Sequence, residues 1–127
     1  MSQRTHQNSP EWGNKSGESS HPKAVVLISA DMEWQIVREI LPETEIQPTP
    51  YGEWFSLRVG APTLGLDVNF LHGGWGKIAA AASTEYAIQR WNPDLLVNLG
   101  TCGGFDGHVQ KGEIILAERT VVYDIIE

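Results

Sequence analysis

Small and polar side chains gather in three short segments, and each segment directly follows a run of apolar residues. The segments are residues 29–33 (SADME), 72–77 (HGGWGK) and 101–104 (TCGG). In open α/β sheets, small ligands bind just beyond the carboxyl ends of the strands. The three segments therefore predict a binding site for a small molecule at one edge of a sheet.

The glycines of these segments also invite comparison with nucleotide-binding loops. A dinucleotide-binding turn joins a strand to a helix, and the next strand ends in an acidic residue. Residues 74–79 fit such a turn, but the next apolar run ends at Leu99 without a carboxylate. A phosphate-binding P-loop requires Gly-Lys-Ser/Thr, whereas Ile78 follows Gly76-Lys77 here. Both nucleotide folds are excluded, and no cofactor is expected. Taken alone, Gly73 and Gly74 fit equally well a turn that lets a helix pack closely on a sheet.

Strand and helix patterns alternate along the chain and supply the elements that would position these segments. Continuous apolar runs are typical of strands buried on both faces, and apolar residues at helical spacing indicate helices. Ser29 or Asp31 could cap the first helix, and Pro48, Pro50 and Gly52 predict a loop after it. The order β-α-β-β-α-β-β favours an α/β sandwich with a mixed sheet. The predicted helices are 34–41 and 77–91, and the predicted strands are 24–29, 54–59 and 66–71 (a hairpin), 95–99, and one or two within 114–116 and 120–123.

The composition is that of a globular protein with a modest core, and it excludes several classes of partner. The chain has 127 residues, of which 41% are hydrophobic, and a formal net charge of -7. Nucleic acids and anionic membranes bind basic surfaces, so neither is an expected partner. No apolar run is long enough to cross a bilayer, and the amino terminus lacks the order of a secretory signal. The single cysteine, Cys102, excludes an internal disulfide and a cysteine-based metal cluster, so we expect no metal and a cytoplasmic location.

The first 22 residues differ in composition from the rest of the chain. Ser, Gln, Asn, Gly and Glu dominate there, with almost nothing to bury. Such a segment cannot offset the entropy lost on ordering. Residues 1–22 are therefore predicted to be a disordered tail, and residues 23–127 to be the folded part.

Several segments resemble the bacterial 5′-methylthioadenosine/S-adenosylhomocysteine nucleosidases, which belong with the purine nucleoside and uridine phosphorylases. The resemblance rests on residues 74–81 (GWGKIAAA) and, most specifically, on 92–104 (NPDLLVNLGTCGG). Residues 111–115 (KGEII) resemble a further family segment, and 24–37 align without gaps to the family's first strand and helix. The resemblance covers residues 24–127. It implies a three-layer α/β sandwich with a mixed central sheet.

The resemblance also implies a reaction and roles for individual residues. Members of the family release adenine from 5′-thio-substituted purine nucleosides, as in methionine salvage. Cleavage of an N-ribosidic bond passes through a cationic ribosyl state, so it requires an activated water and a proton for the departing base. Glu33 falls on the water-activating glutamate, and Thr101 would form a hydrogen bond near that water. Ser29, Cys102 and Gly103 would contribute substrate contacts, the last two through their backbones. Without the resemblance, the residues alone favour a simpler interpretation of Glu33, as a first-turn glutamate stabilised by the dipole of a helix.

Phosphorolysis is the nearest alternative reaction within the wider superfamily. Phosphorylases usually carry an early Gly-Asp-Pro or Gly-Ser-Gly phosphate loop. Residues 28–31 (ISAD) have neither pattern and no arginine nearby, and Gly76-Lys77 is similar to the nucleosidase pattern. Hydrolysis is therefore favoured. Trp34 and Trp75, which lie near the proposed loops, could alter the substrate pocket.

The sequence departs from the family in what it lacks. Members are much longer, and their later half supplies a Met-Glu segment that holds the ribose hydroxyls and an aspartate that protonates adenine. Neither has a counterpart here, and Tyr123 replaces a family histidine beside Asp124. We therefore expect a truncated, amino-terminal part of the domain with an exposed sheet edge. Two functions remain open: a hydrolase completed by a longer chain or a separate polypeptide, or a catalytically silent module that binds nucleosides or forms a homodimer through its first helix and hairpin.

Overall fold

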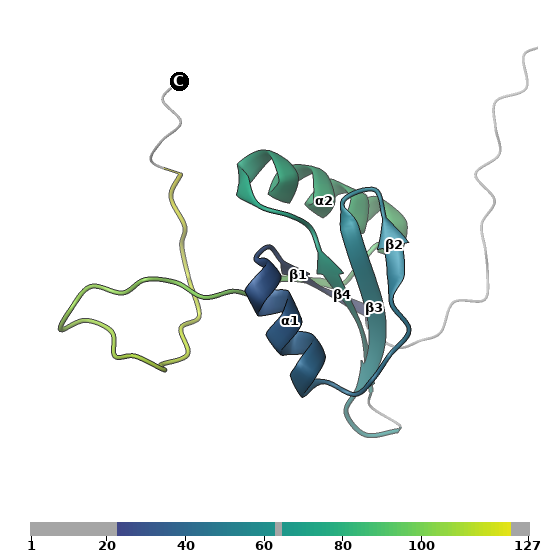
Figure 1. Cartoon of the computed structure of the whole chain (residues 1–127), viewed down its shortest axis with the longest axis horizontal. Coiled ribbons are helices and arrows are strands. Elements are labelled where there is room, and N and C mark those ends of the chain that lie inside the picture. Colours follow the sequence, from purple (N-terminus) through teal and green to yellow (C-terminus); the bar gives the residue numbers. More distant parts are fainter. Residues whose placement is uncertain (1–22, 63–64, 123–127) are drawn as a thin grey trace, which may run out of the picture.

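The computed structural model describes residues 23–62 and 65–122, so the predicted tail at 1–22 lies outside the described residues. Five strands form one sheet in the order β2-β3-β4-β1-β5 (Figure 1). β1 pairs in parallel with β4 and β5, whereas β3 pairs antiparallel with β2 and β4. The predicted mixed sheet and hairpin are confirmed. The strands are β1 (Lys23–Ile28), β2 (Gln47–Thr49), β3 (Gly52–Val59), β4 (Leu66–His72) and β5 (Leu95–Asn98), and the helices are α1 (Asp31–Ile40) and α2 (Gly76–Trp91).

The side chains of β1 alternate between two buried clusters, one on each face of the sheet. Ala24 and Ile28 pack with Trp34 of α1. Val25 and Leu27 pack with Ala87 of α2. Because successive residues of a strand point to opposite faces, the two helices cover opposite faces of the sheet. The predicted three-layer sandwich is confirmed.

Prolines help to set the end of the first helix and the path of the chain after it. α1 stops at Ile40, and Leu41 has extended dihedral angles (φ -84°, ψ 157°), as expected for a residue before proline. The loop predicted after this helix contains a short strand that the sequence pattern did not reveal. β2 includes Pro48, which is tolerated because β2 lies at the edge of the sheet, where one side of the strand needs no pairing.

Beyond β5 the chain leaves the sheet and continues as a long loop, drawn in green to yellow in Figure 1. Residues 99–122 contain neither helix nor strand, so the strand predicted at 114–116 is wrong. Of the strand predicted at 120–123, residues 120–122 are not a strand, and Tyr123 lies outside the described residues. Ile114 and Leu116 are 100% and 95% exposed, respectively. Residues with high β-propensity form a strand only where a neighbouring strand or surface can receive them.

Candidate functional site

The three segments singled out in the sequence meet at one edge of the sheet. β1, β4 and β5 run parallel and adjacent in the order β4-β1-β5, so their carboxyl ends lie side by side. A cavity of about 210 Å³ opens at this edge. Side chains and backbone from all three segments line it, among them Ser29, Glu33, Trp75, Gly76, Gly100 and Thr101.

Glu33, on the first turn of α1, is the centre of the hydrogen bonding at this site. Its Oε1 accepts two bonds from Thr101, one from the backbone N–H and one from the hydroxyl, both at 2.6 Å. The backbone of Ala30, which precedes the helix, is a further hydrogen-bond partner of the carboxylate. A Cβ at Gly100 would lie 3.1 Å from Oε2, so the glycine permits the close approach of the loop. The carboxylate thus joins the start of α1 to the loop after β5.

These bonds decide how α1 begins and how Glu33 titrates. The predicted capping by Ser29 or Asp31 is wrong: Ala30 is the N-cap residue, and no side-chain hydrogen bond from the N-cap position caps the helix. A glutamate at the third helical position that bonds back to the N-cap backbone is one half of a capping box. The hydroxyl and the backbone N–H of Thr101 are the two largest causes that lower the pKa of Glu33. Burial opposes them with a smaller effect, and the bond to the Ala30 backbone lowers the pKa by the least.

The hydrogen bonds and the lowered pKa of Glu33 decide which chemical steps its carboxylate can assist. Because its pKa is lowered, Glu33 stays ionised at neutral pH, which favours a neighbouring cation such as a ribosyl oxocarbenium ion. A carboxylate offers about four lone-pair sites, so the three bonds leave room for a water molecule. The lowered pKa also makes Glu33 a weaker proton acceptor than a base tuned to neutral pH. The arrangement can orient a water and stabilise positive charge.

The structure gathers some of the predicted site residues and separates others. Ser29, Glu33 and Thr101 line the same cavity. Cys102 and Gly103 do not line it, and both are exposed. Cys102 lines instead an adjoining depression of about 780 Å³, which shares residues 98–101 with the cavity and is otherwise formed by the loop after β5. The difference arises because the chain turns away from the sheet directly after Thr101.

The two tryptophans near the predicted loops have different positions. Trp34 is buried against the sheet, 3% exposed, and does not reach the cavity. Trp75 lines the cavity at the start of α2 and is 74% exposed. Asn98, the last residue of β5, also lines the cavity but was not predicted as a site residue. Its position at a strand end is the signal that could have identified it.

Gly73 serves packing, one of the two roles that its sequence context left open. A Cβ at Gly73 would overlap the hydroxyl oxygen of Ser83, which is buried on α2. Gly74, by contrast, has a positive φ of 80° that favours glycine. The first glycine therefore brings α2 close to the sheet, and the second turns the chain into the helix.

Glu33 is the one ionisable side chain among the described residues that line this cavity. The part of the chain that the structure describes also holds no group of three His, Cys, Asp or Glu side chains placed to bind a metal ion. Within the same residues, no helix is both long and apolar enough to span a membrane. The described lining of this cavity thus supplies one carboxylate and no second ionisable group.

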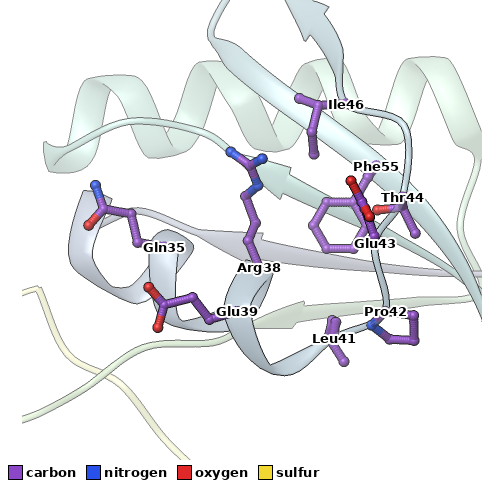
Figure 2. Close-up of a pocket in the computed structure, with 9 residues that line it drawn as sticks. All are labelled: Gln35, Arg38, Glu39, Leu41, Pro42, Glu43, Thr44, Ile46 and Phe55. Carbon is purple, nitrogen blue, oxygen red and sulfur yellow. The ribbon is translucent and has the colours of Figure 1, made fainter.

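A second groove lies on the outer side of α1 (Figure 2). It measures about 460 Å³ and is formed by the later part of α1, the loop that follows and Phe55 of β3. Arg38 of α1 and Glu43 of the following loop are among the residues that line it (Figure 2). The groove contains none of the predicted site residues, and no residue of it lies at the carboxyl ends of β1, β4 or β5. It is therefore separate from the candidate site.

Comparisons with known proteins agree with the geometry. Residues 24–126 match the family model of the phosphorylase superfamily. A 5′-methylthioadenosine/S-adenosylhomocysteine nucleosidase of Marinomonas sp. (strain MWYL1) is 36% identical over 61 residues, which cover 48% of this chain and 26% of the relative. The nucleosidase of the same name from Geobacillus sp. (strain WCH70) is 29% identical over 103 residues, 81% of this chain and 43% of the relative. The chain spans less than half the length of these relatives.

Solved structures lead to the same group of proteins. The 5′-methylthioadenosine/S-adenosylhomocysteine nucleosidase of Colwellia psychrerythraea 34H, in complex with adenine, superposes with a TM-score of 0.56 at 30% identity. The superposition covers 72% of this chain and 36% of that one. The S-adenosylhomocysteine nucleosidase of Streptococcus pyogenes has a TM-score of 0.59 at 15% identity, over 74% of this chain and 38% of the other, and so shares the fold. The resemblance predicted from the sequence is confirmed, and the chain belongs to the phosphorylase superfamily.

Proposed function

We propose that this chain forms part of an N-ribosyl hydrolase that releases adenine from a 5′-thio-substituted purine nucleoside. The observation that carries the proposal is the ionised Glu33, held by Thr101 at the carboxyl edge of the sheet and open to a cavity. The relatives named above are nucleosidases, and one of the solved structures contains adenine. We further propose that the protein acts in the cytoplasm as a homodimer.

In this proposal, Glu33 orients the attacking water and accepts its proton as the bond to the base breaks. Its negative charge stabilises the ribosyl cation that forms in the transition state. Thr101 fixes the carboxylate through two short bonds, so the charge is already in place before the substrate reacts. Ser29, Cys102 and Gly103 are proposed as substrate contacts. Water is favoured over phosphate as the nucleophile because a carboxylate attracts water and repels a phosphate anion.

The departing adenine must also be protonated, and the described lining of the cavity offers no acid for that step. We therefore propose that further polypeptide, of the kind that makes the relatives longer, supplies the acid and completes the site. The same observation favours a second candidate function. A chain with only the carboxylate could bind a nucleoside, or dimerise, without cleaving it.

Release of adenine from methylthioadenosine tests the proposal. The purified chain is incubated with the nucleoside, with and without phosphate, and adenine is measured by chromatography. Glu33→Gln is expected to lower any phosphate-independent release by about 10²- to 10⁴-fold, the usual contribution of general acid–base catalysis. The matched control is Glu39→Gln, because Glu39 is on the same helix but lines the outer groove.

The outcomes separate the two candidates. Phosphate-independent release that depends on Glu33 supports the hydrolase, whereas release that requires phosphate contradicts it and identifies a phosphorylase. Binding of methylthioadenosine without any release, seen by calorimetry, supports the silent module. Release that is equal in the native chain and Glu33→Gln removes Glu33 from the mechanism.

A further inference from the structure

The first turn of α1 lies between two neighbouring strand ends, and each of them contacts it. On the β5 side, Thr101 binds the carboxylate of Glu33. On the β4 side, His72, the last residue of that strand, contacts the same turn through two other residues. Because β1 leads directly into α1 and lies between β4 and β5, the turn is held from both sides. The contact with Thr101 is part of the proposed site, whereas no role has been assigned to His72.

The ring of His72 makes two distinct contacts with the helix. It stacks on the indole of Trp34, with the ring centroids 5.4 Å apart and the planes 11° from parallel. Its Nε2 lies 3.2 Å from Oδ1 of Asp31. This nitrogen is fully buried and has no hydrogen-bond partner among the described residues, so the carboxylate of Asp31 is the polar group that faces it. Stacking on Trp34 fixes the plane of the imidazole, and the carboxylate of Asp31 favours the ring orientation in which Nε2 faces it.

The backbone of His72 is fixed independently of the helix. The N–H of Gly73, the next residue, donates to the carbonyl of Ile28 at 3.1 Å. Gly52 of β3 packs against the carbonyl of His72 so closely that a Cβ on Gly52 would overlap it. His72 is also in parallel register with Ile28 in the sheet. The backbone that carries the imidazole is therefore held in place by the sheet.

The indole of Trp34, on which His72 stacks, is held by further contacts. Nε1 of Trp34 donates a 2.6 Å hydrogen bond to Oε1 of Glu53 on β3. Arg38, one turn further along α1, lies 3.4 Å from the same oxygen. The ring of Phe55 packs against the indole with centroids 5.3 Å apart. Trp34 cannot move away from His72 without disturbing these contacts.

We propose that His72 is a positioning residue that sets the rotation of the first turn of α1, and thereby holds the carboxylate of Glu33 against Thr101. Asp31 and Trp34 are three residues apart and lie on one face of the helix. Glu33 lies between them in sequence and points to the other side, toward the loop after β5. A rotation of α1 that moves Glu33 away from Thr101 would also move Asp31 and Trp34 relative to the imidazole and would break their contacts with it. This role of His72 does not depend on whether the chain cleaves a nucleoside.

Amide hydrogen exchange at Thr101 measures this contact directly. The backbone N–H of Thr101 bonds to Glu33, so Glu33→Gln provides the value expected when the ionised acceptor is lost. His72→Ala is expected to speed exchange of this amide by about five- to tenfold, as for the loss of one hydrogen bond. His72→Phe, which keeps a ring for Trp34 but has no nitrogen for Asp31, should fall between His72→Ala and the native chain. The amide of Val25, in the buried centre of the sheet, serves as the reference for the fold.

The control variant is Asp67→Asn at the opposite end of β4, where Asp67 accepts a 3.1 Å hydrogen bond from Arg58. It removes a polar contact from the same strand, so exchange at Thr101 should stay unchanged. In the double variant Glu33→Ala with His72→Ala, exchange should be no faster than in Glu33→Ala alone, because the acceptor of the Thr101 bond is already absent. Unchanged exchange in His72→Ala, additive effects in the double variant, or an equal change at Val25 would each overturn the proposal. Since nothing is cleaved in this experiment, its result is independent of the nucleosidase proposal.

Discussion

Glu33 has the structural role that its position in a first helical turn predicts, and its catalytic role stays a proposal. Its position in the first turn of a helix explains the bond to Ala30 and the start of α1. The two bonds to Thr101 are not local, because they join residues on opposite sides of β5 in the chain. A structural carboxylate at the mouth of a cavity is therefore also available for chemistry.

The lowered pKa of Glu33 predicts how stability depends on pH. In the unfolded chain the carboxyl titrates near its ordinary value of 4.5, and in the folded chain it titrates lower. Between the two pKa values the unfolded state binds more protons, so the stabilisation from Glu33 is present above pH 4.5 and is lost as the pH falls through the folded pKa. The difference in unfolding free energy between the native chain and Glu33→Gln, measured by denaturant titration, should shrink over that acidic range.

Two variants of Thr101 refine this test. Thr101→Val removes the hydroxyl donor, the largest cause of the lowered pKa, and should reduce the pH-dependent difference. Thr101→Ser keeps the hydroxyl and should preserve most of it. A stabilisation by Glu33 that increases as the pH falls below 4.5 would contradict the hydrogen bonds described for the folded state.

At the scale of the elements, α2 depends on the absence of a side chain at Gly73. Gly73→Ala should lower the unfolding free energy by about 1–3 kcal/mol, the usual cost of adding a methylene group to a tightly packed region. The new Cβ would overlap the hydroxyl of Ser83 and lie 2.8 Å from its Cβ. The free energy of unfolding from urea titrations measures the effect. Gly103→Ala is the control, because nothing lies within 4 Å of a Cβ there, and an equal loss in both variants would show that close packing is not the cause.

The elements predicted correctly share a local signal. The apolar run of β1, the helical spacing of α1 and the alanine-rich composition of α2 require no knowledge of distant residues. The proline at 42 marks the end of α1, and Pro93 follows the end of α2, where Asn92 adopts a left-handed conformation (φ 43°). The gathering of Ser29, Glu33 and Thr101 at one cavity could be predicted in the same way, because they lie at or near strand ends that a parallel sheet brings together.

The features that the sequence pattern did not predict depend on contacts with residues far away in the chain. β2 forms despite Pro48 because only one side of it is paired. Residues 114–116 have a strand-like sequence but no strand beside them among the described residues. Cys102 and Gly103 were assigned by resemblance to longer proteins and stay predictions, since the chain leaves the cavity directly after Thr101. The contact of His72 with Trp34 is also not local, and no sequence pattern reveals it.

At the scale of the whole molecule, the two edges of the sheet are not equivalent. The β2 edge is short and contains Pro48, which lacks a backbone donor. The β5 edge has no proline, and its Leu95 and Leu96, on opposite faces, are 52% and 38% exposed. An apolar edge strand with unpaired backbone groups is a template for another strand. We expect the β5 edge to be the surface on which the chain associates.

Sedimentation at increasing protein concentration tests this expectation. Leu95→Lys should shift the chain toward the monomer, because a charge at an edge strand opposes further pairing. Ile40→Lys is the matched control: Ile40 is 74% exposed, but it lies at the end of α1 and not on the sheet edge. A native chain that stays monomeric throughout, or an equal effect of both variants, would contradict a role for the β5 edge.

The central place of β1 also has a consequence for biosynthesis. β1 is made before the other described elements, yet both of its neighbours, β4 and β5, follow much later in the chain. While β2 and β3 are being synthesised, this apolar strand has neither of these partners with which to pair. The nascent chain must therefore keep the segment from aggregating until β4 has been made. The strand that organises the candidate site is thus synthesised well before the two strands that enclose it.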